Sequence, residues 1–295
     1  GAGAGGLVSA YIAAAVKAKV TLVEAHRMGG DCLNTGCVPS KALIRAARAA
    51  HEMRQVERLG LARVEPRIDW PALMRRVQAV VRDIEPHDSV ARYTALGVDV
   101  RLGHARIVNP WTVEIRPPDG PAERLSTRSI VIAAGAAPIV PPLPGLREAG
   151  VLTSDTLWDA LAALPNIPAR IAVLGGGPIG CELAQALQRL GAQVTQVEMA
   201  DHLLPREDAE VSDLVAAALR ADGVRVLTGH QALRCEPVGG AWALVARGGE
   251  GEQAIAFDAI VCAVGRAARL SGYGLQELGI ATGKTVPTDE YLATL

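Results

Sequence analysis

The chain has 295 residues, with 30 basic and 31 acidic side chains, a formal net charge of −1 and 49% apolar residues. This length suits about two domains of ordinary size (~150 residues each), and the near-neutral charge argues against nucleic-acid binding, which needs a basic excess on one face. No apolar run approaches the ~18 residues of a membrane span, and no leader sequence is recognisable. We therefore expect a soluble, cytoplasmic protein with no nucleic-acid or membrane partner.

The chain opens on a glycine-rich sequence, GAGAGG, in which Gly1, Gly3 and Gly6 have the G-x-G-x-x-G spacing of a dinucleotide-binding turn. An apolar helical stretch follows, and then a predicted strand, VTLVE, that ends in Glu24. In such a unit the first glycine makes the turn, the second admits a pyrophosphate, the third lets helix pack on strand, and the acid accepts ribose hydroxyls. The unit needs a strand before Gly1, so either the natural chain begins upstream or the motif is a coincidence.

A second copy strengthens this interpretation. Residues 171–198 contain a predicted strand, a glycine-rich turn, a helix, a second strand and an acid; the residues of the motif are Gly175, Gly177, Gly180 and Glu198. Two motifs with suitable flanks predict two dinucleotide-binding units, and two helix-packing turns without a ligand are the alternative. A carboxylate at Glu198 can accept both ribose hydroxyls of NAD and repels the extra phosphate of NADP. We expect NAD(H), with NADP(H) less favoured.

Two cysteines, Cys32 and Cys37, lie between the glycine motifs and are separated by the turn-forming sequence Leu-Asn-Thr-Gly, which can bring two sulfurs together. A helix is predicted over about 39–57, and its N-terminus and Lys41 favour the thiolate form of a thiol placed just before it. Half of a metal site and two buried structural thiols are the alternatives, but no further close Cys or Cys/His pair completes four ligands, so we expect no metal. The other three cysteines are expected to be structural: Cys181, Cys235 and Cys262.

Two glycine motifs with CLNTGCVPSK between them resemble the flavoprotein disulfide reductases, the class I pyridine nucleotide-disulfide oxidoreductases that include dihydrolipoyl dehydrogenase, glutathione reductase and mercuric reductase. Three further segments fit this family: a predicted strand over 100–107, and the segments 130–145 and 261–266. A long helical segment is predicted from about Trp70 to Leu96. The segments EPHDSV and GCELAQAL are most similar to the mercuric reductase-like branch. The resemblance implies an α/β fold of two Rossmann-like (βαβ) domains: an FAD-binding domain over 1–148 without its first strand, an NAD-binding domain over 149–268, and a return segment over 269–295. It also implies a C-terminal dimerisation domain that this chain lacks.

The resemblance also implies roles for individual residues. Cys37 would be the flavin-proximal thiolate, and Cys32 would be the interchange thiol that attacks substrate. Lys41 would pair with Glu182 beside flavin N5, where the shape of an ammonium differs from that of an Arg fork. The cofactor contacts that the motifs and the resemblance predict are Gly1, Gly3, Gly6, Glu24, Gly30, Asp31, Lys41, His104, Ala105, Ala134, Gly135, Gly175, Gly177, Gly180, Glu198, Gly265 and Arg266.

The implied activity passes electrons between NAD(H), FAD and a Cys32–Cys37 disulfide to a small dithiol or disulfide substrate, as in dihydrolipoyl dehydrogenase. Reduction of Hg(II) by the same residues and a non-catalytic FAD-binding protein are the alternatives. Pro178 stands where glutathione reductase carries an aromatic residue, which points away from glutathione. The family's His–Glu dyad acts across a homodimer from the domain expected after Leu295, and none of the six histidines fits that role. We expect this chain to be inactive in isolation.

Overall fold

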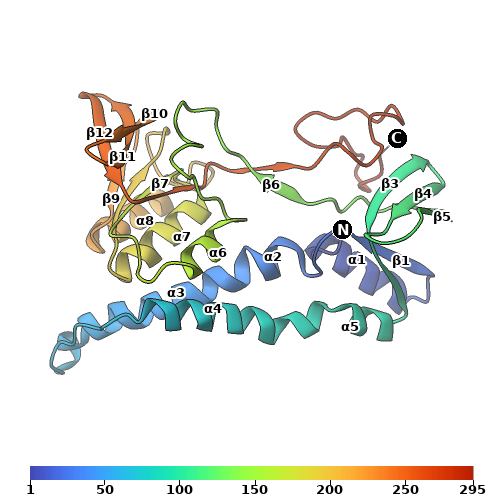
Figure 1. The fold of residues 1–295 in the computed structure, drawn as a ribbon, viewed down its shortest axis with the longest axis horizontal. Coiled ribbons are helices and arrows are strands. Elements are labelled where there is room, and N and C mark those ends of the chain that lie inside the picture. The colour runs from blue at the N-terminus through green and yellow to red at the C-terminus, as the bar shows by residue number, and fades with distance from the viewer. Residues whose placement is uncertain (295) are drawn as a thin grey trace. The chain divides into compact units, whose positions relative to one another are not determined.

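The computed structural model describes residues 1–294, which cluster into two compact units (Figure 1). Unit 1 comprises Gly1–Asn34, Val81–Ala137 and the residues from Arg266 onward, and unit 2 comprises Thr35–Val80 and Pro138–Gly265. The limits of these contact-based units differ from those of the domains expected at 1–148, 149–268 and 269–295, which stay a prediction. The difference arises because residues 35–80 pack with the second glycine motif.

Unit 1 contains the first glycine motif. Its helices are α1 (Ala4–Ala15), α2 (Gly30–Asn34) and α5 (Val90–Ala95), with a 3-10 turn, η2 (Glu85–Asp88), before α5. The strand β1 (Val20–Glu24) pairs in parallel with β2 (Val98–Leu102). The small core of this unit lies between α1, α5 and these strands and consists of Ala2, Leu7, Ala10, Ala14, Leu22, Tyr93 and Val98.

Unit 1 also holds an antiparallel sheet of β3 (His104–Asn109), β4 (Thr112–Arg116) and β5 (Glu123–Ser126), and a short pair of β6 (Ala136–Pro138) with β14 (Arg266–Ala268). The strand expected over 100–107 is divided at Gly103, whose φ is 155°. A Cβ at Gly103 would lie 2.6 Å from the carbonyl oxygen of Arg116, so the chain changes sheets at a position that accepts only glycine.

Unit 2 contains a four-stranded parallel sheet in the order β13-β7-β8-β9. Its strands are β7 (Arg170–Leu174), β8 (Gln193–Val197), β9 (Arg225–Leu227) and β13 (Ala259–Cys262), and its crossover helices are α7 (Pro178–Arg189) and α8 (Ala209–Ala221). The unit β7-α7-β8 is the complete βαβ element predicted over 171–198. Four of the five residues of β7 are buried, as in a parallel strand covered on both faces.

The rest of unit 2 covers this sheet. An antiparallel sheet of β10 (Gln231–Val238), β11 (Ala241–Gly248) and β12 (Gly251–Phe257) forms one cluster with it. The helix α6 (Leu157–Ala162) and most of α4 (Trp70–Ile84) belong to the other cluster, where the indole of Trp70 donates to the carbonyl of Leu161 at 3.0 Å.

Helix α3 (Cys37–Arg54) packs on α7 within unit 2 (Figure 1). It buries Leu43, Ala47 and Ala50, which recur at helical spacing and form one apolar face. The helix begins two residues before the expected start, so Cys37 is its first residue, and a 3-10 turn, η1 (Val56–Leu59), follows it.

The helix expected from Trp70 to Leu96 is divided into α4, η2 and α5. Pro86 lacks the amide N–H that a continuous helix needs, and Ser89 is extended with its hydroxyl accepting from the amide of Arg92, so a new helix begins there. Among the helices in the described part of the chain, none combines the length and the apolar character that crossing a membrane requires.

Candidate functional site

The first glycine loop depends on close backbone approach. A Cβ at Gly6 would lie 1.8 Å from the carbonyl oxygen of Gly1, and a Cβ at Gly1 would lie 2.3 Å from that of Ala133. A Cβ at Gly30 would lie 2.5 Å from the Cα of Gly3. The structure therefore brings four of the predicted FAD-binding glycines together, and three of them cannot carry a side chain.

Glu24 closes this loop from the end of β1. Its buried carboxylate accepts from the amide of Ala2 at 2.5 Å and from the amide of His26 at 2.8 Å. The carbonyl of Glu24 accepts from the amide of Gly103 at 2.8 Å, which places the start of β3, His104 and Ala105, next to the acid.

Two predicted cofactor contacts of unit 1 form an ion pair that the sequence did not indicate. The guanidinium of Arg266 lies 2.5 Å from the carboxylate of Asp31 and donates to the carbonyl of Ala136 at 3.0 Å. Beside them, the carbonyl of Gly135 accepts from the amide of Arg269 at 3.0 Å, and Ala134 has its Cα 3.9 Å from a Cβ built at Gly1. These residues lie together because β6 and β14 pair.

The second glycine loop, in unit 2, repeats the geometry of the first. A Cβ at Gly180 would lie 2.2 Å from the carbonyl oxygen of Gly175, and a Cβ at Gly175 would lie 2.5 Å from that of Ala263. A Cβ at Gly177 would meet no described atom within 4 Å, so the second glycine faces open space. This is the position at which a pyrophosphate approaches the backbone in a dinucleotide site, so the loop fits a dinucleotide.

Glu198 closes the second loop as Glu24 closes the first. Its carboxylate accepts from the amide of Gly176 at 2.5 Å and from the amide of Ala200 at 2.7 Å. Gly265 lies in the same unit, where its carbonyl accepts from the amide of Ile139 at 3.0 Å.

Two buried side-chain oxygens have no hydrogen-bond partner among the described residues, and both lie in the candidate sites. One is Oε1 of Gln196, beneath the second glycine loop; the side-chain nitrogen of this residue donates to the carbonyl of Gly175 at 3.0 Å. The other is the hydroxyl of Thr35, between the two motif cysteines. Unsatisfied buried polar atoms are rare in folded proteins, so these two mark positions where a further partner would be accommodated.

The segment with the two motif cysteines passes from one unit to the other. Cys32 lies in α2 of unit 1 and Cys37 begins α3 of unit 2, and both side chains are exposed. The side-chain amide of Asn34 donates to the carbonyls of Met28 and Gly30, both at 2.9 Å.

Two further observations concern thiols and their surroundings in unit 2. The indole of Trp158 donates to the carbonyl of Thr35 at 2.7 Å, two residues before Cys37. The three cysteines expected to be structural are buried, and burial raises the pKa of each thiol, that of Cys235 to about 11.

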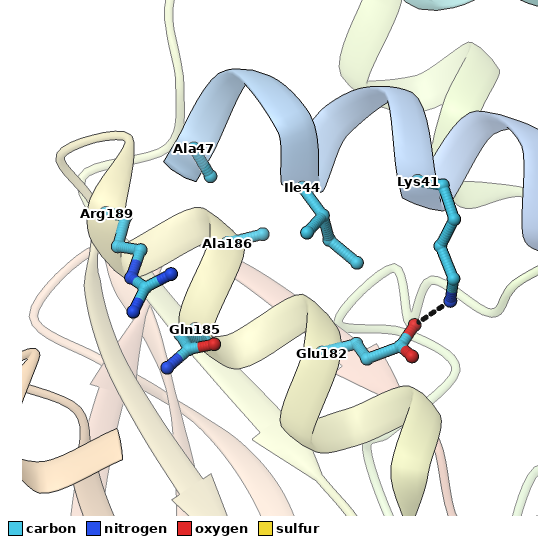
Figure 2. Close-up of a pocket in the computed structure, with 7 residues that line it drawn as sticks. All are labelled: Lys41, Ile44, Ala47, Glu182, Gln185, Ala186 and Arg189. Carbon is cyan, nitrogen blue, oxygen red and sulfur yellow. Dashed lines mark hydrogen bonds and ion pairs between the residues drawn. The ribbon is translucent and has the colours of Figure 1, made fainter. Parts of the chain in front are cut away.

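Lys41 and Glu182 form the predicted pair within unit 2. The Nζ atom of Lys41, on α3, lies 2.6 Å from Oε2 of Glu182, on α7 (Figure 2). Their side chains are 59% and 41% exposed. The pair lies at one end of a groove of about 210 Å³ that is lined by Lys41, Ile44, Ala47, Glu182, Gln185, Ala186 and Arg189.

A second polar cluster, which the sequence did not indicate, lies near the other end of this groove. The carboxylate of Asp222, at the end of α8, accepts from Arg189 at 2.8 Å and from Gln185 at 2.7 Å, and lies 3.0 Å from Nδ1 of His51. The Asp222 side chain is only 6% exposed, so this cluster links α3, α7 and α8 through a buried charge.

The family model of pyridine nucleotide-disulphide oxidoreductases matches residues 1–295. The chain belongs to this family. Membership confirms the predicted α/β fold class and the expectation of FAD and a pyridine nucleotide as the family's cofactors.

Curated relatives carry both names that the resemblance suggested. The chain is 36% identical over 299 residues to the dihydrolipoyl dehydrogenase of Pseudomonas aeruginosa, and 32% identical over 297 residues to the mercuric reductase of Streptomyces lividans. Each alignment covers 100% of this chain and 62% of the relative. This chain thus spans about three-fifths of the length of these two relatives.

Solved structures agree with the family assignment. The HOCl-induced flavoprotein disulfide reductase RclA from Escherichia coli matches with a TM-score of 0.81 and 26% identity, over 100% of this chain and 62% of that one. LpdA from Mycobacterium tuberculosis matches with a TM-score of 0.87 and 25% identity, over 100% of this chain and 64% of that one.

Membership in the family does not assign the individual residues, so their roles stay predictions. Residues of the sites that the sequence did not indicate include Thr35, Trp158, Gln196 and the Asp222 cluster. Only Gln196 gave a signal, because it is a polar residue inside a predicted strand, between Thr195 and Val197. Within the part of the chain that is described, no group of three or more His, Cys, Asp or Glu side chains could hold a metal ion.

Proposed function

We propose that the protein is an NADH-linked, FAD-dependent disulfide oxidoreductase acting on a small dithiol or disulfide, as its dihydrolipoyl dehydrogenase relatives are named. The observation that carries the proposal is the ion pair of Lys41, on the helix that Cys37 begins, with Glu182 on α7. An exposed ion pair adds little to stability, so its place one helical turn from Cys37 supports a role beside the cysteines rather than a purely structural one. When bound, FAD supplies the two-electron chemistry between a nicotinamide and a thiol pair.

The two exposed cysteines account for the thiol steps. The thiolate of Cys32 attacks one sulfur of a substrate disulfide, forms a mixed disulfide, and expels a thiolate that takes a proton. The thiolate of Cys37 then attacks the sulfur of Cys32, forms the Cys32–Cys37 disulfide, and expels the second substrate thiol. Cys37 stands at the N-terminus of α3, where the amide groups of the first turn stabilise a negative charge.

The glycine loops and their acids account for nucleotide binding. Gly3 and Glu24 would hold FAD, and Gly177 and Glu198 would hold the pyridine nucleotide, each glycine at the phosphates and each acid at a ribose. The carboxylate of Glu198 favours a ribose with two free hydroxyls over one that carries a phosphate. NADH is therefore the proposed reductant.

The proposal is tested by turnover of the purified full-length protein with FAD bound. We expect reduction of lipoamide by NADH, and a kcat/KM at least about tenfold lower with NADPH, since a repelled phosphate costs a charge-charge interaction. Cys32→Ser and Cys37→Ser are each expected to abolish disulfide reduction, and Cys235→Ala serves as the cysteine control. A higher kcat/KM with NADPH than with NADH would contradict the cofactor assignment.

Reduction of Hg(II) is the second candidate, because the Streptomyces lividans relative is a mercuric reductase. The same preparation is assayed with Hg(II) and lipoamide side by side. Faster NADH oxidation with Hg(II) than with lipoamide would favour this candidate. Purified protein without flavin absorbance, or without turnover of either substrate, would favour a non-catalytic binding protein.

A further inference from the structure

The two loop acids use both carboxylate oxygens for backbone amides before any ligand is considered. In unit 2, one oxygen of Glu198 accepts from Gly176, inside the glycine loop, and the other from Ala200, two residues after the acid. In unit 1, the oxygens of Glu24 accept from Ala2 and from His26 in the same relative positions. The arrangement occurs twice in one chain, in two separately packed units.

Contacts around Gly176 show how closely the loop follows the acid. A Cβ at Gly176 would lie 2.8 Å from Cγ and 2.9 Å from Cβ of Glu198. The carbonyl of Gly176 accepts weakly from the thiol of Cys181 at 3.4 Å, and the carbonyl of the preceding Gly175 accepts from Gln196. Within the described residues, Glu198 is the acceptor for the Gly176 amide, which makes the acid a support of the loop itself.

We propose that Glu198 is a positioning residue that holds the second glycine loop in its phosphate-binding conformation. It therefore contributes to the binding of any ligand whose phosphate meets this loop, whether or not the ligand has an adenosine ribose. The inference rests on the proposed function, in which this loop takes the pyridine nucleotide. It adds to that function, because an acid that acts only on the adenosine ribose has no effect on a ligand that lacks this ribose.

The variant Glu198→Gln tests the proposal with a side chain of nearly the same size and shape. An amide offers one acceptor oxygen, so its NH₂ group faces the amide of either Gly176 or Ala200 and that hydrogen bond is lost. The matched control is Glu210→Gln, which removes one charge from an exposed position of α8 in the same unit.

The first measurement needs no ligand. Hydrogen exchange of the flavin-loaded full-length protein is followed at residues 175–200 and over α8 in the wild type and in both variants. We expect faster exchange of the Gly176 or Ala200 amide in Glu198→Gln, by about tenfold, with the urea midpoint and the exchange of the α8 amides unchanged. Unchanged exchange at both amides would overturn the proposal.

The second measurement compares two oxidised ligands by calorimetric titration: NAD⁺, and nicotinamide mononucleotide, which has the phosphate but no adenosine. We expect Glu198→Gln to weaken both, and Glu210→Gln to weaken neither. Weakening of NAD⁺ alone would leave only the ribose role and overturn the proposal. If the wild type bound neither ligand, the proposed function would fail, and the exchange data would still decide whether Glu198 holds the loop.

Discussion

Lys41 and Glu182 are 141 positions apart in the chain and 2.6 Å apart between Nζ and Oε2, where α3 crosses α7. Both side chains are substantially exposed, and exposed ion pairs contribute about 1 kcal/mol or less to stability. The pair is therefore better explained by a role in the chemistry at Cys37, the first residue of α3, than by a contribution to the stability of the fold.

The first prediction separates these two effects. Lys41→Gln and Glu182→Gln are each expected to change the free energy of unfolding by less than about 1 kcal/mol and to lower turnover at least tenfold (~1.4 kcal/mol), as measured by urea unfolding and NADH-dependent disulfide reduction. Arg48→Gln is the matched control, because Arg48 pairs with Glu52 at 2.8 Å on the same helix. Equal losses of turnover in Arg48→Gln and Lys41→Gln would contradict the assignment.

Asp222 is predicted to behave in the opposite way. Its side chain is 6% exposed and bonds Arg189, Gln185 and His51, so Asp222→Asn leaves the partly buried guanidinium of Arg189 without its counter-charge. We expect a loss of about 3 kcal/mol in the free energy of unfolding. Asp201→Asn, at a side chain that is 93% exposed, is the control and is expected to be neutral. A neutral Asp222→Asn would show that the cluster does not stabilise the packing of the three helices.

Cysteine labelling should divide the five thiols into two classes. After reduction, a maleimide is expected to modify Cys32 and Cys37, which are exposed, before the three buried cysteines. The buried thiols also carry raised pKa values, so they contain less reactive thiolate at pH 8. Mass spectrometry should find two labels in the native protein and five in denaturant. A double variant, Cys32→Ser with Cys37→Ser, should take up none in the native state.

Burial of Cys235 predicts a pH dependence of stability. Its pKa is raised from 9.0 to about 11, so the folded state holds the proton more tightly than the unfolded state. The resulting stabilisation is complete below pH 9 and is lost as the pH rises to 11, by roughly 1 to 2 kcal/mol. Unfolding by urea at pH 8, 9, 10 and 11 measures this loss. Cys235→Ala should lower stability at every pH and flatten its decline; an unchanged slope would exclude Cys235 as the cause.

Two glycines of the second loop offer a matched comparison. A Cβ at Gly180 would lie 2.2 Å from a backbone oxygen, whereas a Cβ at Gly177 would meet no described atom within 4 Å. Gly180→Ala is therefore expected to destabilise unit 2 by about 2 kcal/mol or more. Gly177→Ala should keep the stability of the wild type and weaken NAD⁺ binding, since its methyl group stands where the phosphates approach. Thermal unfolding and calorimetric titration distinguish the two, and equal NAD⁺ affinity in Gly177→Ala would argue against this loop as the phosphate site.

The sequence was informative where function depends on short, ordered motifs. The two glycine loops, the acids Glu24 and Glu198, and the fold class were predicted because each loop and its acid belong to one βαβ unit. Lys41 and Glu182 were paired only through the family resemblance. The ion pair of Arg266 with Asp31 spans 235 positions, and no periodicity in either segment encodes such a contact.

Element boundaries were less predictable for local reasons. The expected strand over 100–107 is divided at Gly103, because the chain turns there from the parallel pair to the antiparallel sheet. A single glycine within a strand pattern does not indicate that the strand changes its pairing partner. The helix with Cys37 starts earlier than expected because Gly36 precedes it as the cap, whereas Pro39 had indicated a later start. Burial of the Thr35 hydroxyl was not predictable, since it depends on residues distant in the chain.

The hydrogen bond from Trp158 to the carbonyl of Thr35 makes the cysteine segment optically observable. Indole emission responds to the polarity of its hydrogen-bond partner and to nearby sulfur, and Trp158 is one of four tryptophans in the chain. Its fluorescence can therefore report oxidation or alkylation two residues away at Cys37, without an added dye. Retaining Trp158 while replacing the other three tryptophans would give a protein whose own emission follows the thiol chemistry in real time.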